Sequence, residues 1–204
     1  MSTKIALDGV GGQGVRLIAG IMGALLARMG KEVTVLFDYD SSVRGSMSDA
    51  FLIFDDEPIA NPVVEEADIM LKLADKGHLR ISGRKVVADL GLDVPGAEQI
   101  PFASLGSQLF GKELFGNMIA LGRLLRLAEI EFNEAAIRES LPRRYEDDNV
   151  KAIRFGYDLS DEEIVRLASA APPSRFQMNT AATSETHERT ISAGHGVAAG
   201  EPRS

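Results

Sequence analysis

The N-terminal part of the chain alternates between short apolar runs and one long segment with helical periodicity. Residues 4–10 are typical of a short buried strand, and in residues 13–29 apolar side chains recur at the spacing of one helix face. Gly30 then ends the helix, and residues 32–39 are rich in the β-branched and aromatic side chains of a second strand. This opening predicts a pair of parallel strands joined by a right-handed crossover. Gly20 and Gly23 inside the helix predict a close approach of its backbone to the sheet.

The pattern changes from strands to helices along the chain. Apolar runs that end at a polar or glycine break predict further strands within residues 49–59, 67–75 and 83–92. From about residue 111 to 127 the periodicity becomes helical. Asn133 has the position of an N-cap, and Ser160 with Glu163 has the spacing of a capping box, so two more helices are expected there. Strands followed by helices predict an α/β architecture.

The composition changes after Ala170. The remaining segment is rich in Ser, Thr, Ala and Gly and contains few large apolar side chains. Such a segment cannot bury enough apolar surface to offset the entropy lost on ordering. We therefore predict one α/β domain over residues 1–169 and a tail over residues 170–204 that is disordered alone or ordered against a partner.

A glycine-rich turn lies between the first strand and the first helix. Gly9, Gly11 and Gly14 follow the pattern G-x-G-x-x-G, and the helix start offers unpaired N–H groups and a partial positive charge to an anion. Asp38 ends the second strand, where a dinucleotide-binding fold holds a ribose hydroxyl. The residues alone leave three interpretations: NAD or FAD binding, binding of another phosphate-bearing ligand, or a structural tight turn. The expected fold is α/β, with a Rossmann-like, mostly parallel sheet flanked by helices, a helical C-terminal part and an irregular tail.

Composition narrows the chemistry that the chain can perform alone. Its 204 residues include no cysteine and three histidines, and the formal net charge is −8. Disulfides, zinc–thiolate sites and iron–sulfur clusters held by its own thiolates are therefore excluded, and a negative chain is a poor ligand for nucleic acid or anionic membranes. No catalytic or metal-binding residue is predicted. The longest apolar run, residues 17–27, is much shorter than the ~20 residues of a membrane span, and no signal-peptide pattern is present, so a cytoplasmic location is expected.

Two motifs together make the sequence similar to a known family. Residues 9–15 read GVGGQGV, and the loop after the second strand carries Tyr39, Arg44, Gly45 and Ser48 of the pattern Y…R-G-G-x-S, with Ser46 in place of the second glycine. With the helical stretch over residues 117–158, these motifs make residues 4–160 resemble the gamma subunit, or gamma-type domain, of the 2-oxoacid:ferredoxin (acceptor) oxidoreductases.

The resemblance implies an accessory subunit of an enzyme complex that oxidatively decarboxylates a 2-oxoacid to acyl-CoA. It implies that thiamine diphosphate and the iron–sulfur clusters are carried by other subunits, and that coenzyme A is the co-substrate. The implied partners are thiamine-diphosphate-binding alpha and beta subunits and a ferredoxin-like iron–sulfur subunit. This chain would help to shape the active site and the approach of coenzyme A. The competing hypothesis is a free-standing NAD(P)- or FAD-binding protein or dehydrogenase.

The candidate ligand-binding residues lie in the two motif loops. Arg44 is the strongest candidate, because a guanidinium can hold a phosphate or carboxylate through two hydrogen bonds; its alternative is a surface arginine paired with Asp38 or Asp40. Gln13 is expected to bind either a ligand or nearby backbone, and Asn117 to be the N-cap of its helix. The glycine turn would then be a backbone nest for a phosphate of coenzyme A or a close-packed subunit contact. The complete set of candidates is Gly11, Gly12, Gln13, Gly14, Arg44, Gly45, Ser46 and Ser48.

Overall fold

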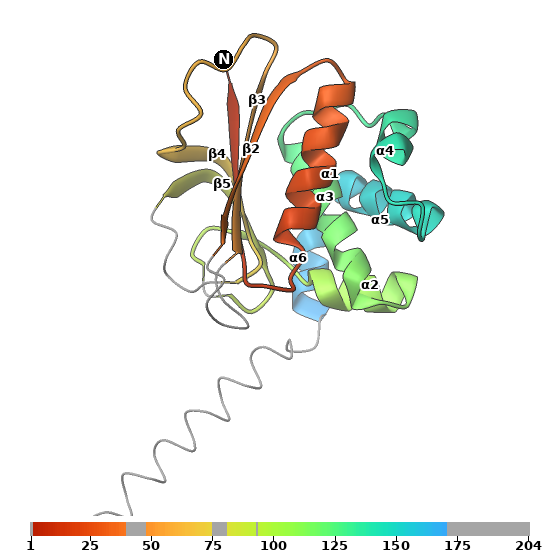
Figure 1. Cartoon of the computed structure of the whole chain (residues 1–204). Helices are drawn as coiled ribbons and strands as arrows, with labels where there is room; N and C mark the ends of the chain where they lie inside the picture. The colour runs from red at the N-terminus through yellow and green to blue at the C-terminus, as the bar shows by residue number, and fades with distance from the viewer. Residues whose placement is uncertain (1, 40–47, 75–80, 93, 171–204) are drawn as a thin grey trace, which may run out of the picture. The chain divides into compact units, whose positions relative to one another are not determined.

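The computed structural model describes residues 2–39, 48–74, 81–92 and 94–170, which form an α/β domain (Figure 1). The predicted tail, apart from Ala170, lies outside the described residues, so its state stays a prediction. In chain order the elements are β1 (Thr3–Asp8), α1 (Val15–Arg28), β2 (Glu32–Tyr39), β3 (Ser48–Asp55), β4 (Glu66–Lys72), β5 (Ser82–Asp89), β6 (Glu98–Ile100), α2 (Phe102–Phe110), the 3-10 helix η1 (Glu113–Phe115), α3 (Gly116–Leu127), α4 (Glu134–Ser140), α5 (Glu146–Asp158) and α6 (Asp161–Ala170).

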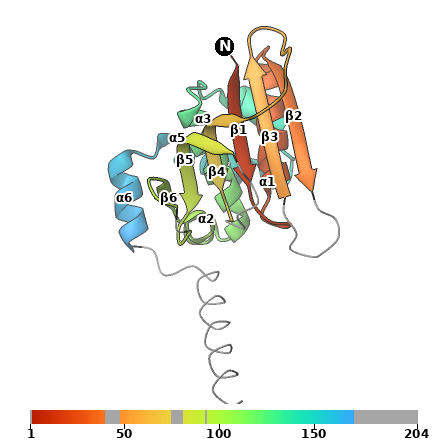
Figure 2. The same ribbon diagram turned by 90° about the vertical axis from the view of Figure 1, so that its left-hand side faces the viewer.

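The six strands form one mixed sheet in the order β2-β3-β1-β4-β5-β6 (Figure 2). β1, β4, β5 and β6 pair in parallel, whereas β3 is antiparallel to both of its neighbours, β1 and β2. The α/β class is confirmed. The predicted pairing of β1 with β2 is wrong: the two strands run in the same direction, but β3 lies between them. β3 follows β2 in the chain, pairs antiparallel with it, and pairs with β1 along its other edge.

Helices α1 to α5 cover one face of the sheet, and α6 packs beside β6 at one edge (Figures 1 and 2). The core lies between this helical layer and the sheet, because alternate strand residues point to it. Ile5 and Leu7 of β1 and Leu52 of β3 are completely buried there. Ala6 and Met70 point to the opposite face, where a smaller apolar cluster forms with Ala67.

Glycines bring helices close to their neighbours at specific points. A β-carbon at Gly23 would lie 2.7 Å from Cγ2 of Val35, so the predicted close approach of α1 to the sheet is confirmed at that position. At Gly20 the prediction is wrong, because a β-carbon there would meet nothing within 4 Å. The tightest contact is elsewhere, where Gly122 of α3 and Gly156 of α5 each face the other helix's backbone.

Two helices of the C-terminal half, α2 and α5, were not predicted as separate helices from the periodicity of the sequence. α2 starts at Phe102, directly after Pro101, and the carboxylate of Asp89 at the end of β5 accepts the N–H groups of Phe102 (3.1 Å) and Leu90 (3.0 Å). α5 begins with three acidic residues that as a sequence resemble a solvated charge run. The caps predicted at Asn133 and Ser160 are confirmed: Asn133 accepts the N–H of Ala136, and Ser160 and Glu163 bond reciprocally.

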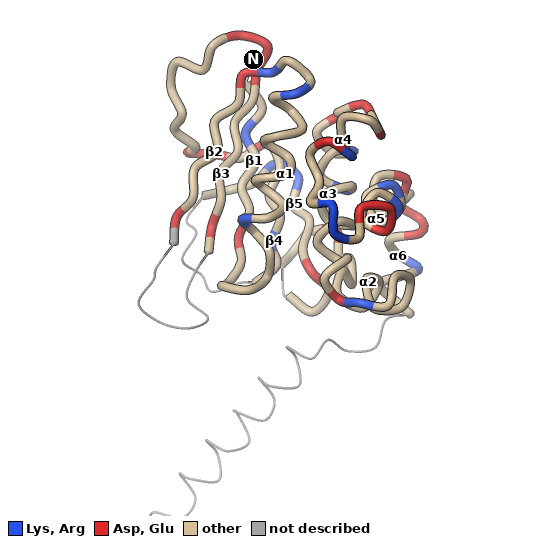
Figure 3. Tube along the Cα trace, turned by 45° about the vertical axis from the view of Figure 1, so that its right-hand side comes forward, with Lys and Arg blue, Asp and Glu red and all other residues tan. Residues whose placement is uncertain are grey.

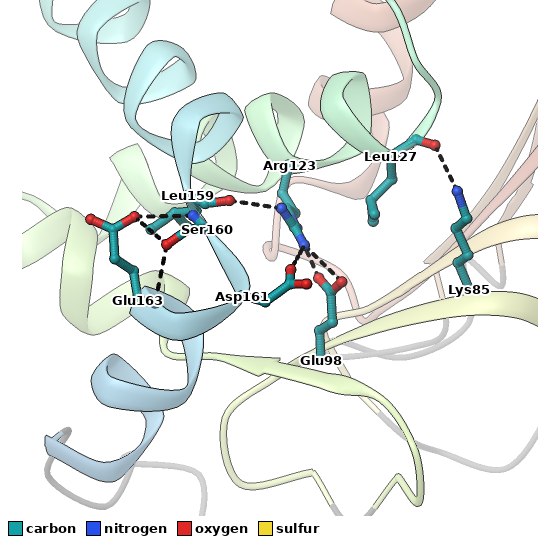
Figure 4. A network of polar contacts seen from close by, with 8 residues as sticks. All are labelled: Lys85, Glu98, Arg123, Leu127, Leu159, Ser160, Asp161 and Glu163. Carbon is teal, nitrogen blue, oxygen red and sulfur yellow. Dashed lines mark hydrogen bonds and ion pairs between the residues drawn. The ribbon is translucent and has the colours of Figure 1, made fainter.

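A buried arginine ties the end of the sheet to the last helices (Figure 4). Arg123 of α3 is 4% exposed and donates two hydrogen bonds, of 2.8 and 2.7 Å, to the carboxylate of Glu98 in β6. It also donates to the carbonyl of Leu159 (2.9 Å) and to Asp161 (3.3 Å). One side chain therefore fixes α3, β6 and the junction of α5 with α6.

Among the described residues, none of the helices combines the length and the apolar character that crossing a bilayer requires.

Candidate functional site

The glycine turn leaves the carboxyl end of β1 and enters α1 with its tip exposed to solvent. Gly11 and Gly12 are exposed, and Gly12 has a φ of 97°. Gly14 is the N-cap of α1 with a φ of 81°, and it contributes no side chain to the helix start. Both positive φ values are in the region that glycine adopts at little cost. The turn therefore presents backbone rather than side chains at the first turn of α1.

Gln13 holds this turn against the sheet. Its side-chain oxygen accepts the N–H of Val10 (2.8 Å), and its side-chain nitrogen donates to the carbonyl of Leu73 just after β4 (2.8 Å). The amide thus bridges the turn to a neighbouring strand. Of the two roles expected from the sequence, the one visible in the structure is bonding to nearby backbone.

Asn117 packs against Gly14, and this contact was not expected from the sequence. A β-carbon at Gly14 would lie 2.1 Å from Nδ2 of Asn117, so any larger residue at this position would force the amide to move. The predicted N-cap role of Asn117 is wrong: the N-cap of α3 is Phe115, and no side chain caps that helix. The 3-10 turn η1 runs directly into α3, so Asn117 falls inside the helix rather than before it.

Charged side chains meet at the same edge of the sheet. Asp8 at the end of β1 is 1% exposed and stands opposite Lys72 of β4, with 3.6 Å between a carboxylate oxygen and Nζ. Asp49 at the start of β3 is 4% exposed. Ligands of open α/β sheets bind outside the carboxyl ends of the parallel strands, which is where this group lies. The sequence carries one signal for it: a charged residue within an apolar run or at one of its ends.

The second motif loop ends beside the glycine turn, at Ser48. Ser48 is buried, its N–H donates to the carbonyl of Gly9 (3.0 Å), and it stands opposite Tyr39 in the β2–β3 ladder. Arg44, Gly45 and Ser46 lie outside the described residues, so their predicted roles stay predictions. Of the candidates in that loop, the structure places Ser48 against the glycine turn, through its backbone.

The strand order separates the glycine turn from the acidic residue of a dinucleotide site. Asp38 of β2 pairs with Asp49 of β3, and β3 lies between Asp38 and β1. Because neighbouring strands are ~4.8 Å apart, Asp38 stands about 10 Å from the line of β1. In a dinucleotide-binding fold the ribose-binding strand is the immediate neighbour of β1. This geometry disfavours the NAD interpretation and leaves the phosphate and tight-turn interpretations.

The start of α1 can accept an anion. Ile18 is the first residue of α1 whose N–H bonds back along the helix, to the carbonyl of Gly14 at 2.9 Å. Neither a capping side chain nor an acidic first-turn residue neutralises this end. Helix starts of this kind bind phosphate or carboxylate groups through backbone N–H groups and the helix dipole. Within the described parts of the chain, no three His, Asp or Glu side chains are grouped so that they could hold a metal ion.

Comparison with known proteins places this geometry in a family. Residues 4–159 match the family model described as pyruvate ferredoxin/flavodoxin oxidoreductase. The chain belongs to this family. The matched range contains the glycine turn, Gln13, Ser48 and Asn117, and it agrees with the family that the two motifs predict.

Two relatives that are named as enzyme subunits align with most of the chain. The 2-oxoglutarate synthase subunit KorC of Methanocaldococcus jannaschii is 31% identical over 179 residues, which span 79% of this chain and 96% of that protein. The subunit of the same name from Archaeoglobus fulgidus is 29% identical over 162 residues, spanning 76% of this chain and 87% of that protein. These members of the family are subunits of oxidoreductases.

Solved structures share the fold. The gamma subunit of a keto/oxoacid ferredoxin oxidoreductase from Geobacter sulfurreducens superposes with a TM-score of 0.63 at 23% identity, covering 82% of this chain and 98% of that one. The 2-oxoglutarate:ferredoxin oxidoreductase from Magnetococcus marinus gives a TM-score of 0.60 at 18% identity, covering 85% of this chain and 32% of that longer one. The first of these family folds is therefore a separate subunit, and the second is part of a larger polypeptide.

Proposed function

We propose that the chain is the gamma-type subunit of a complex that oxidatively decarboxylates a 2-oxoacid to acyl-CoA and passes the electrons to ferredoxin or another acceptor. The observation that carries this proposal is the family match over residues 4–159, which includes both motif loops. The thiamine diphosphate and the iron–sulfur clusters would be held by other subunits. The absence of cysteine agrees with this division, because cluster ligands are thiolates. The partners would be thiamine-diphosphate-binding alpha and beta subunits and a ferredoxin-like subunit.

The role proposed for the glycine turn is to bind a phosphate of coenzyme A as this co-substrate approaches the complex. Its exposed tip at Gly11 and Gly12 and the uncapped start of α1 support this role. Gln13 would act as a positioning residue, because both ends of its amide bond to backbone. Arg44 would supply the charged contact, as expected from the sequence.

The first experiment tests the assembly. The full chain carries an affinity tag in its native host, and co-purified subunits are identified by mass spectrometry together with bound thiamine diphosphate and iron. We expect larger subunits that contain both. Isolation of a lone chain that binds NAD would overturn the proposal.

The second experiment tests the ligand role within the purified complex. We expect Arg44→Ala to leave the assembly intact and to raise the KM for coenzyme A by roughly tenfold, which corresponds to the loss of one charge-assisted contact. Arg84→Ala is the matched control, because Arg84 is an exposed arginine of β5 that pairs with Glu66. Unchanged KM in the Arg44 variant would contradict the ligand role while leaving the subunit assignment untouched.

A further inference from the structure

An apolar groove opens between α1, η1, α3 and the turn before α5. Its volume is about 430 Å³, and its apolar lining is Leu17, Ile21, Leu114, Met118 and Pro142. Leu17 and Leu114 are 43% and 46% exposed. Large side chains that line one groove and stay open to water are typical of a surface that another molecule covers.

Two cations converge on one phenol at the rim of this groove. Nζ of Lys112 donates to the phenolic oxygen of Tyr145 (2.5 Å), and Nη2 of Arg144 donates to the same oxygen (3.1 Å). Both cations also lie over the ring, 3.8 and 4.9 Å from its centroid. The two positive groups are therefore within about 6 Å of each other and repel. These hydrogen bonds, with that from Lys112 the stronger influence, hold the pKa of the Tyr145 phenol below its usual 10.

Nearby carboxylates do not neutralise this pair. The first turn of α5 is acidic (Figure 3), but its Glu146 and Asp147 bond to Arg138, at 3.2 and 2.7 Å. Among the residues that the structure describes, neither Lys112 nor Arg144 forms an ion pair with a carboxylate. In a chain of net charge −8, two neighbouring cations without an acidic partner mark a place for an external anion.

The turn that presents the cations is fixed by the fold. Asn149 of α5 is 6% exposed; its side chain donates to the carbonyl of Arg144 (3.2 Å), and its backbone N–H donates to the carbonyl of Tyr145 (2.8 Å). Tyr145 has a φ of 59°, a left-handed conformation that non-glycine residues adopt rarely and that is concentrated at functional sites. The position of the phenol is therefore set before any partner arrives.

We propose that this groove, named here the Tyr145 groove, receives a segment of a partner subunit in which apolar side chains are followed by a carboxylate. The apolar side chains would cover Leu17 and Leu114, and the carboxylate would bind between Lys112 and Arg144. Tyr, Arg and Met are enriched at the centres of protein interfaces, which favours a polypeptide over a small anion as the occupant. The inference rests on the proposed function, because it requires the chain to be a subunit.

A charge reversal within the complex tests the inference. The double variant Lys112→Glu and Arg144→Glu, carried by the tagged full chain, is expected to bind its partner subunits at least tenfold more weakly than wild type, measured by native mass spectrometry over a salt series. The matched control is Arg126→Glu with Arg154→Glu. These exposed arginines also lie over aromatic rings, those of Tyr157 and Phe132, and the change in net charge is the same. The control is expected to bind like wild type.

A crosslink gives the positive readout. A photoreactive phenylalanine analogue at position 114 in the complex is expected to crosslink to a partner-subunit peptide that contains Asp or Glu beside apolar residues. Wild-type binding by the double variant, or a crosslink only within this chain or to a small molecule, would overturn the inference. If wild type itself retains no partner subunits, the proposed function fails instead, so the two failures are distinguishable.

Discussion

The amide nitrogen of Asn117 stands 2.1 Å from the place that a β-carbon of Gly14 would occupy. This contact joins the glycine turn at the end of β1 to the start of α3. We expect Gly14→Ala to destabilise the fold by about 2–4 kcal/mol, because alanine would clash with the amide and would also be held at a φ of 81°. Urea unfolding of the purified chain measures the loss.

Two controls separate the clash from the backbone strain at Gly14. Gly12→Ala has a comparable φ of 97° but no atom within 4 Å of its new β-carbon, so we expect it to lose only about 1 kcal/mol. Adding Asn117→Ala to Gly14→Ala is expected to restore part of the stability. A double variant that is no more stable than Gly14→Ala alone would contradict the proposed contact.

The sequence predicted the turn but not what packs on it. The glycine spacing and the flanking strand and helix were readable because φ, helix periodicity and strand composition are local properties. The packing of Asn117 on Gly14 and the bridge from Gln13 to Leu73 depend on residues far apart in the chain. Nothing near Asn117 in the sequence distinguishes a residue that caps a helix from one that contacts another loop.

The same distinction explains the error in the sheet. Each of the first three strands was visible as an apolar run, but the local pattern does not say which strands are neighbours. β3 takes the place beside β1, and Asp38 is thereby moved one strand away from the glycine turn. The local pattern predicted a glycine turn before the start of a helix, and the long-range topology changed which ligand that turn favours.

Two helical glycines are predicted to respond oppositely to alanine. A β-carbon at Gly156 would lie 1.9 Å from the carbonyl oxygen of Ile119 in α3, and backbone cannot move as a side chain can. We expect Gly156→Ala to destabilise the chain by roughly 3 kcal/mol or more, because α3 and α5 must separate. Gly20→Ala meets no atom within 4 Å on the exposed side of α1 and should stabilise by up to about 1 kcal/mol. Thermal unfolding measures the stability of both variants. Equal effects would show that α3 and α5 can move apart at little cost.

Arg123 is expected to be irreplaceable by lysine. Lysine has one ammonium group and cannot reproduce the paired bonds to Glu98 together with the bond to the Leu159 carbonyl. We expect Arg123→Lys to lower the free energy of unfolding by about 2–4 kcal/mol, since the polar groups around it lose partners. Arg126→Lys on the exposed side of the same helix should change it by no more than about 0.5 kcal/mol. A similar loss in both variants under urea unfolding would contradict the special role of Arg123.

Asp89 is expected to make stability depend on pH. Burial raises the pKa of its carboxyl group from 3.8 to about 6, although the N–H groups of Phe102 and Leu90 oppose the shift. Because the folded state holds this proton more tightly than the unfolded state, stability should fall as pH rises from about 4 to 6 and then level off.

The variant Asp89→Asn tests this pH dependence. Both backbone N–H groups bond to the same oxygen of Asp89, Oδ1, so the amide oxygen of Asn can accept them without a buried charge. We therefore expect Asp89→Asn to remove this part of the pH dependence and to stabilise the chain above pH 6 by up to about 3 kcal/mol. Urea unfolding at a series of pH values checks this. A variant whose stability profile runs parallel to that of wild type would mean that the pKa of Asp89 is the same in the folded and unfolded states.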